Sequence, residues 1–455
     1  MAPSPDPQAR FLLSRDGLAA SLGILVPEVL LPRPGLDLSR WAVVACDQYT
    51  AEPAYWDAVE SLVGEVPSTL RLVLPEIRLE REGPEEVERR IEGIGRSMEA
   101  YLADGVLRSA GTCAVLVERS TPLHPSRWGL VLAVDLERYD FAPGSRALVR
   151  ATEGTVLSRL PPRARIRRDA PLELPHVQLL FDDPARSVIP PLAALAAAGR
   201  LEPLYDADLM MGGGAVRGYR VDGASPELRE ALRALSRLRS LSEDGLLFAV
   251  GDGNHSLAAA KRHWESVREG LPSGSDPTAH PARYALVEAV DLNDPGLEFE
   301  PIHRIVYGVG LDELEKAALD RFAGQGPVVR GFDDADQAVR FARGCDPATH
   351  PVPMLAGGRG AVLLLDRPAA SLAVASVQGF LDALAAERPF RIDYIHGEDV
   401  VLRLSREEGT ALLLPPIAKA SLFPRIASEG ILPRKAFSMG ESFEKRYYME
   451  SRRIR

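Results

Sequence analysis

The sequence predicts a mixed α/β (α+β) protein with more than one domain. Short apolar strands alternate with amphipathic helices along most of the chain, a pattern typical of sheets covered by helices. A strand, a glycine-rich turn and an alanine-rich helix follow one another across residues 246–265. The length of 455 residues exceeds the usual size of a domain built around one hydrophobic core. We therefore expect an N-terminal α/β segment (1–145), a central core (146–310) and a C-terminal α+β domain (311–455).

The composition is that of an ordinary globular protein. Hydrophobic residues make up 46% of the chain and charged residues 26%, so substantial cores can form. The net charge of −10 argues against general nucleic-acid binding, which needs a clustered positive surface. Neither a membrane span nor a signal peptide is expected, and the three cysteines form no disulfide or zinc pattern. We expect a cytoplasmic protein that binds neither nucleic acid nor membrane.

The N-terminal segment predicts a small set of strands and helices. Apolar runs at 24–32 and 41–46 are typical of strands, and the first is bounded by prolines. Residues 85–102 predict a long amphipathic helix with Glu and Arg on its solvent face. Two further strands, at 113–118 and 129–135, are expected to pair as a hairpin.

The later part of the chain predicts more helices and strands. Helices at 191–198 and 226–240 flank a triple glycine at 212–214. This glycine run lacks the lysine of a P-loop, so we interpret it as a hairpin or bulge rather than a ligand loop. In the C-terminal domain we expect a helix at 311–322 and, among others, a strand at 400–404.

The densest positive run in this acidic protein lies between residues 150 and 168. Prolines interrupt the run, which would not suit a regular solvent-exposed helix face. We therefore expect an irregular, rigid loop whose guanidinium groups converge on an oxyanion, with Arg150, Arg159 and Arg163 as the phosphate-binding candidates. The alternative is an ordinary surface loop in an arginine-rich chain.

The turn at 251–256 is the strongest candidate site. Gly251 and Gly253 permit a sharp turn and a close approach of a ligand to the main chain. Asn254 or Ser256 could cap the helix that follows, and its free N–H groups would attract an anion. Asp252, at the end of the strand, could hold Mg²⁺ or receive a proton. A capped helix without a ligand is the alternative interpretation.

Two histidines are further candidates. His255 lies one residue into the predicted helix. His303 and Arg304 are adjacent at the entry to a predicted strand, directly after the pair Pro301 and Ile302. Such a pair suits the edge of an active site, although a structural pair is the alternative.

Several separate blocks, in one order, resemble a protein family over nearly the full length of the chain. The family is the bacterial and archaeal domain-of-unknown-function family ten-fifteen. The blocks that carry this resemblance are Ala45-Cys-Asp-Gln-Tyr-Thr50, Arg150-Ala-Thr-Glu-Gly-Thr155 with Pro161-Pro-Arg163, Glu173-Leu-Pro-His176, Gly251-Asp-Gly-Asn-His255, Pro301-Ile-His-Arg304 and Pro433-Arg-Lys-Ala-Phe-Ser-Met-Gly440.

The strand, Asp-Gly-x-His turn and helix also resemble, more distantly, the ParB/sulfiredoxin-type fold, which includes a free serine kinase. This resemblance implies a ParB/sulfiredoxin-like core with large insertions and a turn that holds nucleotide phosphates. It implies that Asp252 and His255 belong to that turn and that Glu153 is the base acting on a serine hydroxyl. The chain departs from the pattern at Asn254, where His is common, and at Ser256, where a phosphate-binding Arg is expected.

We therefore expect a kinase of a small hydroxylated metabolite such as free L-serine, with Mg²⁺ and with ATP, ADP or pyrophosphate as donor. A nucleotide-binding regulator, and an acid–base hydrolase or isomerase of a phosphorylated or carboxylated compound, remain alternatives. The block 433–452 could close over the site or join copies of the chain in a homo-oligomer. The expected catalytic residues are Glu153, Asp252, His255 and His303, with Asp252 as metal ligand and Arg150, Arg159, Arg163, Gly251, Gly253, Asn254 and Arg304 as phosphate ligands.

Overall fold

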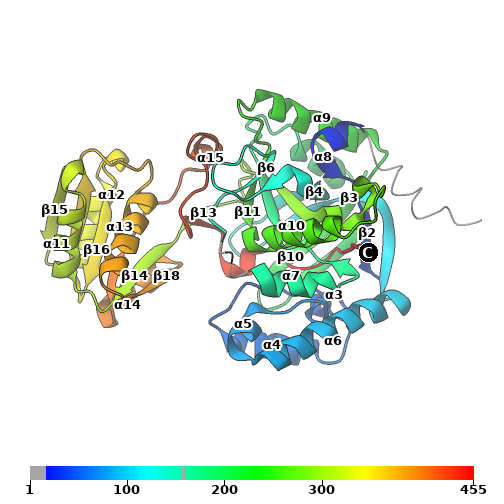
Figure 1. The fold of residues 1–455 in the computed structure, drawn as a ribbon, viewed down its shortest axis with the longest axis horizontal. Coiled ribbons are helices and arrows are strands. Elements are labelled where there is room, and N and C mark those ends of the chain that lie inside the picture. Colours follow the sequence, from blue (N-terminus) through cyan, green and yellow to red (C-terminus); the bar gives the residue numbers. More distant parts are fainter. Residues whose placement is uncertain (1–16, 156, 158–159) are drawn as a thin grey trace, which may run out of the picture. The chain divides into compact units, whose positions relative to one another are not determined.

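The structure, a computed structural model, describes residues 17–155, 157 and 160–455. The chain forms two compact units, labelled by their elements in Figure 1. The first unit contains Met1–Leu297 together with Ser442–Arg455, and the second contains Glu298–Glu441. The expected boundaries at 145 and 310 are not boundaries of these units, because one sheet continues across residue 145 and the C-terminal segment pairs with the first unit.

The first unit is built around a mixed sheet that has eleven strands in the described part of the chain. Its central strands mix parallel and antiparallel pairing: β8 (Gln178–Phe181) is parallel to β12 (Tyr284–Asp291) and antiparallel to β11 (Phe248–Asp252). The strand order is β5 (Tyr139–Asp140), β6 (Val149–Ala151), β11 (Phe248–Asp252), β8 (Gln178–Phe181), β12 (Tyr284–Asp291), β4 (Arg127–Asp135), β3 (Leu107–Ser120), β10 (Gly214–Asp222) and β9 (Glu202–Leu209), with β1 (Ile24–Leu25) on β4 and β2 (Glu28–Pro32) on β3.

Helices cover both faces of this sheet, because successive residues of its central strands are buried on opposite sides. Ala114 and Leu116 of β3 enter one core, whereas Cys113, Val115 and Val117 enter the other. The first core also contains α2 (Gly17–Ser21), α8 (Ile189–Ala197), α9 (Pro226–Leu241) and α10 (Asn254–Glu269), and the second contains α3 (Leu38–Trp41), α4 (Pro53–Val63), α5 (Glu76–Arg81) and α6 (Pro84–Ala103).

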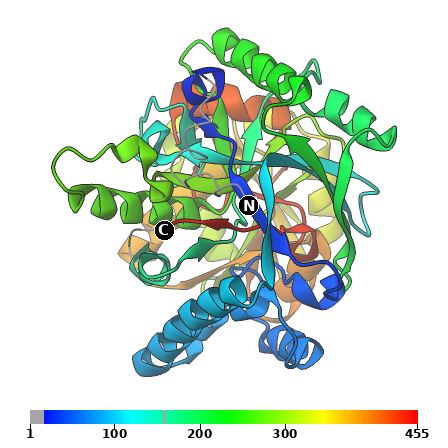
Figure 2. The same ribbon diagram turned by 90° about the vertical axis from the view of Figure 1, so that its right-hand side faces the viewer.

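The C-terminal segment returns to the first unit. Ser451 exchanges backbone hydrogen bonds with Leu30, and β21 (Arg452–Arg453) pairs with β7 (Leu172–Glu173). In Figure 2 this red segment runs beside the blue N-terminal strand. Residues from the two ends of the sequence are therefore neighbours in one unit.

Both predicted hairpins are present. β3 and β4 are antiparallel, and the triple glycine joins the antiparallel strands β9 and β10. The irregular loop expected between residues 150 and 168 is wrong for Leu160–Arg168, which forms the helix α7. Pro161 and Pro162 fall in its first turn, where a missing N–H costs no intrahelical hydrogen bond.

The second unit is a six-stranded sheet with helices, among the described residues. The strand predicted at 400–404 is wrong, because these residues lie in the helix α14 (Glu398–Glu407), whose Val401 and Ser405 are buried one helical turn apart. The sheet order is β15 (Pro327–Phe332), β17 (Arg359–Leu365), β16 (Val352–Ala356), β19 (Thr410–Leu412), β14 (His303–Tyr307) and β18 (Arg391–Ile395). The other elements are α11 (Leu311–Arg321), α12 (Ala335–Arg343), α13 (Ala373–Glu387), α14 (Glu398–Glu407), α15 (Leu422–Glu429) and the pair β13 (Phe299–Pro301) and β20 (Phe437–Met439).

The structure confirms the mixed α/β prediction, since helices and strands alternate in both units. Within the described residues, no helix combines the length and the apolar character that crossing a membrane requires. The described residues also form short 3-10 helices: η1 (Thr69–Arg71), η2 (Leu136–Arg138), η4 (Pro277–Ala279), η5 (Pro281–Arg283), η6 (Ala323–Gln325), η7 (Pro347–Thr349), η8 (Lys419–Ser421) and η9 (Ser442–Glu444).

Candidate functional site

The predicted strand, turn and helix are present as β11 and α10. Gly253 joins them with φ of 81°, in the left-handed region that favours glycine. A Cβ atom at this position would lie 3.0 Å from Cα and Cγ2 of Val177. The side-chain cap expected from Asn254 or Ser256 is wrong, because α10 begins without a side-chain cap hydrogen bond. Its first N–H groups are therefore not capped by a side chain of the turn.

The sheet brings two more strand ends to this turn. β6 is parallel to β11, with Ala151 opposite Val250, so Thr152 and Glu153 follow at the same edge as Asp252. Thr152 donates a hydrogen bond of 2.6 Å to the carbonyl of Val250, and the amide of Asn254 donates one of 3.4 Å to the Thr152 hydroxyl. The Oδ1 atom of Asn254 is buried and has no hydrogen-bond partner among the described residues.

Asp252 contacts a lysine from the C-terminal segment. Nζ of Lys445 lies 3.3 Å from Oδ2 of Asp252, and the N–H of Gly253 donates a hydrogen bond of 2.9 Å to Oδ1. Lys445 is 6% exposed. A buried ammonium group therefore faces the carboxylate at the start of α10.

A histidine at the start of β8 completes this edge. β8 is antiparallel to β11, so residues that precede β8 lie beside the end of β11. Nε2 of His176 is 3.0 Å from the hydroxyl of Ser256 and 3.8 Å from Oδ2 of Asp47, and Nδ1 is 2.8 Å from the hydroxyl of Tyr448. These contacts fix the imidazole from both sides.

Two carboxyl groups at this site have pKa values shifted in opposite directions. Burial alone would raise the pKa of Asp47, but His176, a hydrogen bond from Gln48 and the nearby cations Lys445 and Arg163 together lower it. Burial, and then the charge of Asp47, raise the pKa of Glu76 despite its ion pair with Arg163. Asp47 is therefore the better-stabilised anion, and Glu76 is the carboxyl group that takes up a proton first.

A cavity of about 150 Å³ lies next to these groups. His176, Ser256, Cys46 and Tyr448 line it, and burial raises the pKa of the Cys46 thiol, which keeps it protonated. The remaining wall is largely apolar, formed by side chains such as Leu72, Met98, Ile166, Leu257 and Leu286. The site thus has a polar edge and an apolar pocket.

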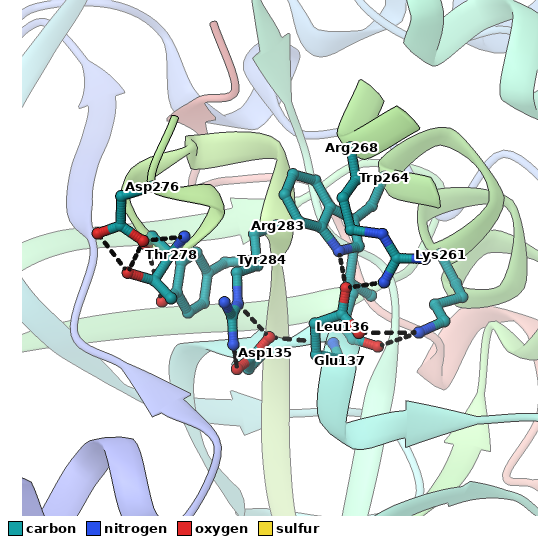
Figure 3. A network of polar contacts seen from close by, with 10 residues as sticks. All are labelled: Asp135, Leu136, Glu137, Lys261, Trp264, Arg268, Asp276, Thr278, Arg283 and Tyr284. Atoms are coloured by element: carbon teal, nitrogen blue, oxygen red, sulfur yellow. Dashed lines mark hydrogen bonds and ion pairs between the residues drawn. The ribbon is translucent and has the colours of Figure 1, made fainter. Parts of the chain in front are cut away.

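The other end of α10 is anchored to the segment after β4, as Figure 3 shows. The carboxylate of Glu137 accepts hydrogen bonds of 2.6 Å from the indole of Trp264 and from Arg268, and Nζ of Lys261 lies 3.9 Å from it. Burial raises the pKa of Glu137, but these three partners outweigh it and lower the pKa. This contact holds the helix whose first turn forms the candidate site.

The predicted arginines do not converge on this turn. Arg150 is 3% exposed and is bound to Asp244, with 2.5 Å between the guanidinium and the carboxylate, and also to the carbonyl of Ala147. Arg163, from α7, is paired with Glu76. Arg159 lies outside the described residues.

His303 and Arg304 belong to the second unit, whereas the turn belongs to the first. Nδ1 of His303 accepts a hydrogen bond of 3.0 Å from the N–H of Leu414. Arg304 is completely buried, and its guanidinium group donates to the side chain of Gln378 and to the carbonyl of Ile302. Both side chains therefore have structural partners within the second unit.

Of the other predicted site residues, Gly251 and Asp252 end β11, Gly253 forms the turn, and Asn254 and His255 begin α10. Glu153 follows the end of β6. Sequence reasoning assigned no role to Asp47, Glu76, His176 and Lys445. Asp47 and His176 lie in blocks that carried the family resemblance, so the resemblance could have pointed to them as site residues. Glu76 had no such signal, whereas Lys445 lies in the block 433–452, a segment that we expected could close over the site.

The described residues include no group of three or more histidine, cysteine or carboxylate side chains that could hold a metal ion. Mg²⁺ is commonly held by one or two carboxylates together with substrate phosphates and water. Asp252 fits that role only in company with phosphate oxygens.

Comparison with known proteins gives a family match and several distant structures. The profile of a family described as a protein of unknown function, DUF1015, matches residues 30–384. No curated protein matches the chain. A mutant free serine kinase in complex with AMP aligns at 10% identity and a TM-score of 0.39, covering 70% of this chain and 90% of its own.

Two other solved structures are similarly distant. A conserved hypothetical protein from Pyrococcus furiosus aligns at 9% identity and a TM-score of 0.37, covering 71% of this chain and 95% of its own. SbnI from Staphylococcus aureus, truncated at its C-terminus, aligns at 10% identity and a TM-score of 0.35, covering 68% of this chain and 82% of its own.

Proposed function

We propose that the chain, which belongs to the DUF1015 family, transfers a phosphoryl group from ATP, ADP or pyrophosphate to the hydroxyl group of a small metabolite such as free L-serine. The observation that carries this proposal is the pairing of Asp252 with the buried Lys445 at the uncapped start of α10. Phosphoryl transfer needs neutralised charge and a positioned nucleophile more than covalent help from the protein.

Lys445 and the first N–H groups of α10 would bind the phosphate oxygens. Helix N-termini attract anions through these N–H groups and the helix dipole. Ser256 stands where the distant resemblance expects an arginine, and Arg150 and Arg163 are bound to carboxylates. Lys445 therefore takes the place of the missing cation, although it comes from another part of the sequence.

Asp252 would be the protein ligand of Mg²⁺, which would neutralise charge on the phosphate oxygens. In this structure the Asp252 carboxylate contacts Lys445. Binding of Mg²⁺ to Asp252 would replace that contact. Lys445 would move its contact from the carboxylate to the phosphate.

Glu153 would accept the proton of the attacking hydroxyl group. It follows the end of β6, which is parallel to β11 and paired with it next to Asp252. The cavity lined by His176 and Ser256 adjoins the same turn and would receive the acceptor. The donor and acceptor would thus meet at one edge of the sheet.

Titration calorimetry tests the binding part of this proposal. Purified protein is titrated with ATP, ADP and pyrophosphate, each with Mg²⁺, and compared with Asp252→Asn. Asp206→Asn is the matched control, since Asp206 is exposed and paired with Arg217. We expect one donor to bind, with at least about tenfold weaker binding in Asp252→Asn alone. Binding of none of the three by folded protein would contradict the proposal.

The pair Asp47 and Glu76 favours a second candidate, an acid–base hydrolase or isomerase of a phosphorylated or carboxylated compound. Their pKa values are shifted in opposite directions, as in enzymes where one carboxyl group donates and another accepts a proton. This enzyme would need Asp47 for turnover and would show no dependence on a nucleotide or pyrophosphate. Turnover that requires neither donor would favour it over the kinase.

A further inference from the structure

The second unit contains a cavity of about 320 Å³ at one edge of its sheet. β14 and β16 begin at this edge and β19 ends there, since β19 is antiparallel to both. The C-terminal turn of α12 and the start of α14 cover the edge, through Ala342, Arg343 and Glu398. Its volume is that of a small-metabolite pocket.

Proline residues are concentrated at this edge of the sheet. Proline has no N–H group to donate to a neighbouring strand, although Pro301 and Pro353 still lie within paired strands. The prolines that line the cavity are Pro301, Pro347, Pro351, Pro353, Pro415 and Pro416. Val339, Ala342, Leu413 and Leu414 add further apolar surface. Proline rings commonly pack against aromatic rings, so the wall suits a flat aromatic ligand.

One buried polar side chain, His303, faces this apolar wall. His303 is 3% exposed and lines the cavity. Its Nδ1 atom accepts the N–H of Leu414, so the neutral imidazole carries its proton on Nε2. No side chain or carbonyl group in the described residues hydrogen-bonds Nε2. Burial, and then the charge of Arg304, lower the pKa of His303 to about 4, which keeps the ring neutral at pH 7.

The charged groups at the cavity balance one another. One guanidinium nitrogen of Arg343 lies 2.8 Å and 2.7 Å from the two carboxylate oxygens of Glu398. The thiol of Cys345 donates to the carbonyl of Phe341. A ligand here would therefore meet a wall whose two opposite charges are paired with each other, together with one directed donor, the Nε2 atom of His303.

We propose that this cavity binds a neutral, flat aromatic compound of one or two rings, whose hydrogen-bond acceptor receives the Nε2 proton of His303. The occupied cavity would be a ligand site of the second unit, additional to the candidate site of the first. His303 would then serve recognition of this ligand, rather than proton transfer at the turn.

Quinoline and naphthalene test the proposal on the full chain. The two have the same two-ring shape, but only quinoline carries a ring nitrogen that accepts a hydrogen bond. Ligand-observed NMR titration should show quinoline binding about tenfold tighter than naphthalene. Equal affinities, or no binding of quinoline at millimolar concentration, would overturn the proposal.

Two substitutions locate the binding. His303→Asn keeps an acceptor for the N–H of Leu414 but removes the Nε2 donor, so quinoline affinity should fall to that of naphthalene. His350→Asn is the matched control, because His350 is a buried histidine of the same unit whose Nδ1 contacts Ser376 and which does not line the cavity. Undiminished quinoline binding by folded His303→Asn, or equal loss in both variants, would refute the assignment. The comparison of the two compounds on the unmodified chain stands even if a variant fails to fold.

Discussion

The ammonium group of Lys445 lies 3.3 Å from the carboxylate of Asp252, although the two residues belong to distant parts of the sequence. The contact forms because the last residues of the chain return to the first unit. Ser451 pairs with Leu30, and Arg452 pairs with Glu173. The C-terminal segment therefore delivers a cation to a turn whose own sequence lacks one.

Replacing Lys445 should weaken donor binding. Lys445→Gln keeps a side chain that can hydrogen-bond but removes the charge, so affinity for the phosphate donor should fall by about tenfold to hundredfold. Titration calorimetry measures the change. Lys316→Gln in α11 is the control, since Lys316 is an exposed lysine and should bind as the unmodified chain does. Equal affinity in Lys445→Gln would remove Lys445 from the site.

Glu153→Gln should separate catalysis from binding. Loss of a positioned general base typically lowers turnover by about 100-fold to 10,000-fold, whereas nucleotide affinity should stay the same. Product formation is followed by phosphorus NMR, with Glu230→Gln, an exposed carboxyl group of α9, as control. A regulator without catalysis would show no turnover in either form, and full turnover in Glu153→Gln would show that the base is another group.

Gly253→Ala should destabilise the protein more than Gly245→Ala does. Both glycines have positive φ, 81° and 78°, so each substitution carries the left-handed strain of about 1–2 kcal/mol. A Cβ at Gly253 would also meet Val177 at 3.0 Å, whereas a Cβ at Gly245 has open space. Crowding adds about 1–3 kcal/mol for Gly253→Ala alone. Urea denaturation measures both, and equal losses would show that the turn has room for a side chain.

Glu137→Gln should destabilise the anchored end of α10 in a pH-dependent way. The carboxylate accepts charge-assisted and indole hydrogen bonds, so the loss should be about 1–3 kcal/mol at pH 7. The pKa of Glu137 in the folded protein lies below its ordinary value, so its contribution to stability is present above that ordinary value and is lost as the pH falls through the folded pKa.

Urea denaturation of both proteins between pH 7 and pH 3 measures this effect. The difference in unfolding free energy should shrink toward acid. A difference that stays constant across this range would show that the Glu137 charge contributes nothing.

Local sequence signals predicted local structure well. Gly253 marked the turn between β11 and α10, whereas Gly251 lies within β11, and two short apolar runs marked the hairpin of β3 and β4. The conformation of the proline-containing segment and the pairing of distant side chains were harder to predict from the sequence. Pro161 and Pro162 suggested an irregular loop, yet they occupy the first turn of α7, where proline is well tolerated.

The missed site residues share a physical reason. Glu76 approaches Asp47 because its backbone N–H bonds the carbonyl of Cys46, and Lys445 arrives with the returning C-terminal segment. Neither contact leaves a spacing pattern in the sequence. Arg150 and Arg163 illustrate the opposite error, since charge density suggested phosphate ligands where the structure has ion pairs with Asp244 and Glu76.

Phosphorus NMR of the full-length chain with L-serine, Mg²⁺ and each of ATP, ADP and pyrophosphate tests the central claim most directly. The account predicts that one donor is consumed while a phosphomonoester signal appears in equal amount, and that Asp252→Asn and Lys445→Gln slow this conversion. A survey of other small hydroxyl compounds extends the test if serine is not the acceptor. Absence of any transfer to these hydroxyl groups, in protein that remains folded, would contradict the assignment of the turn at Asp252 as a phosphotransferase site.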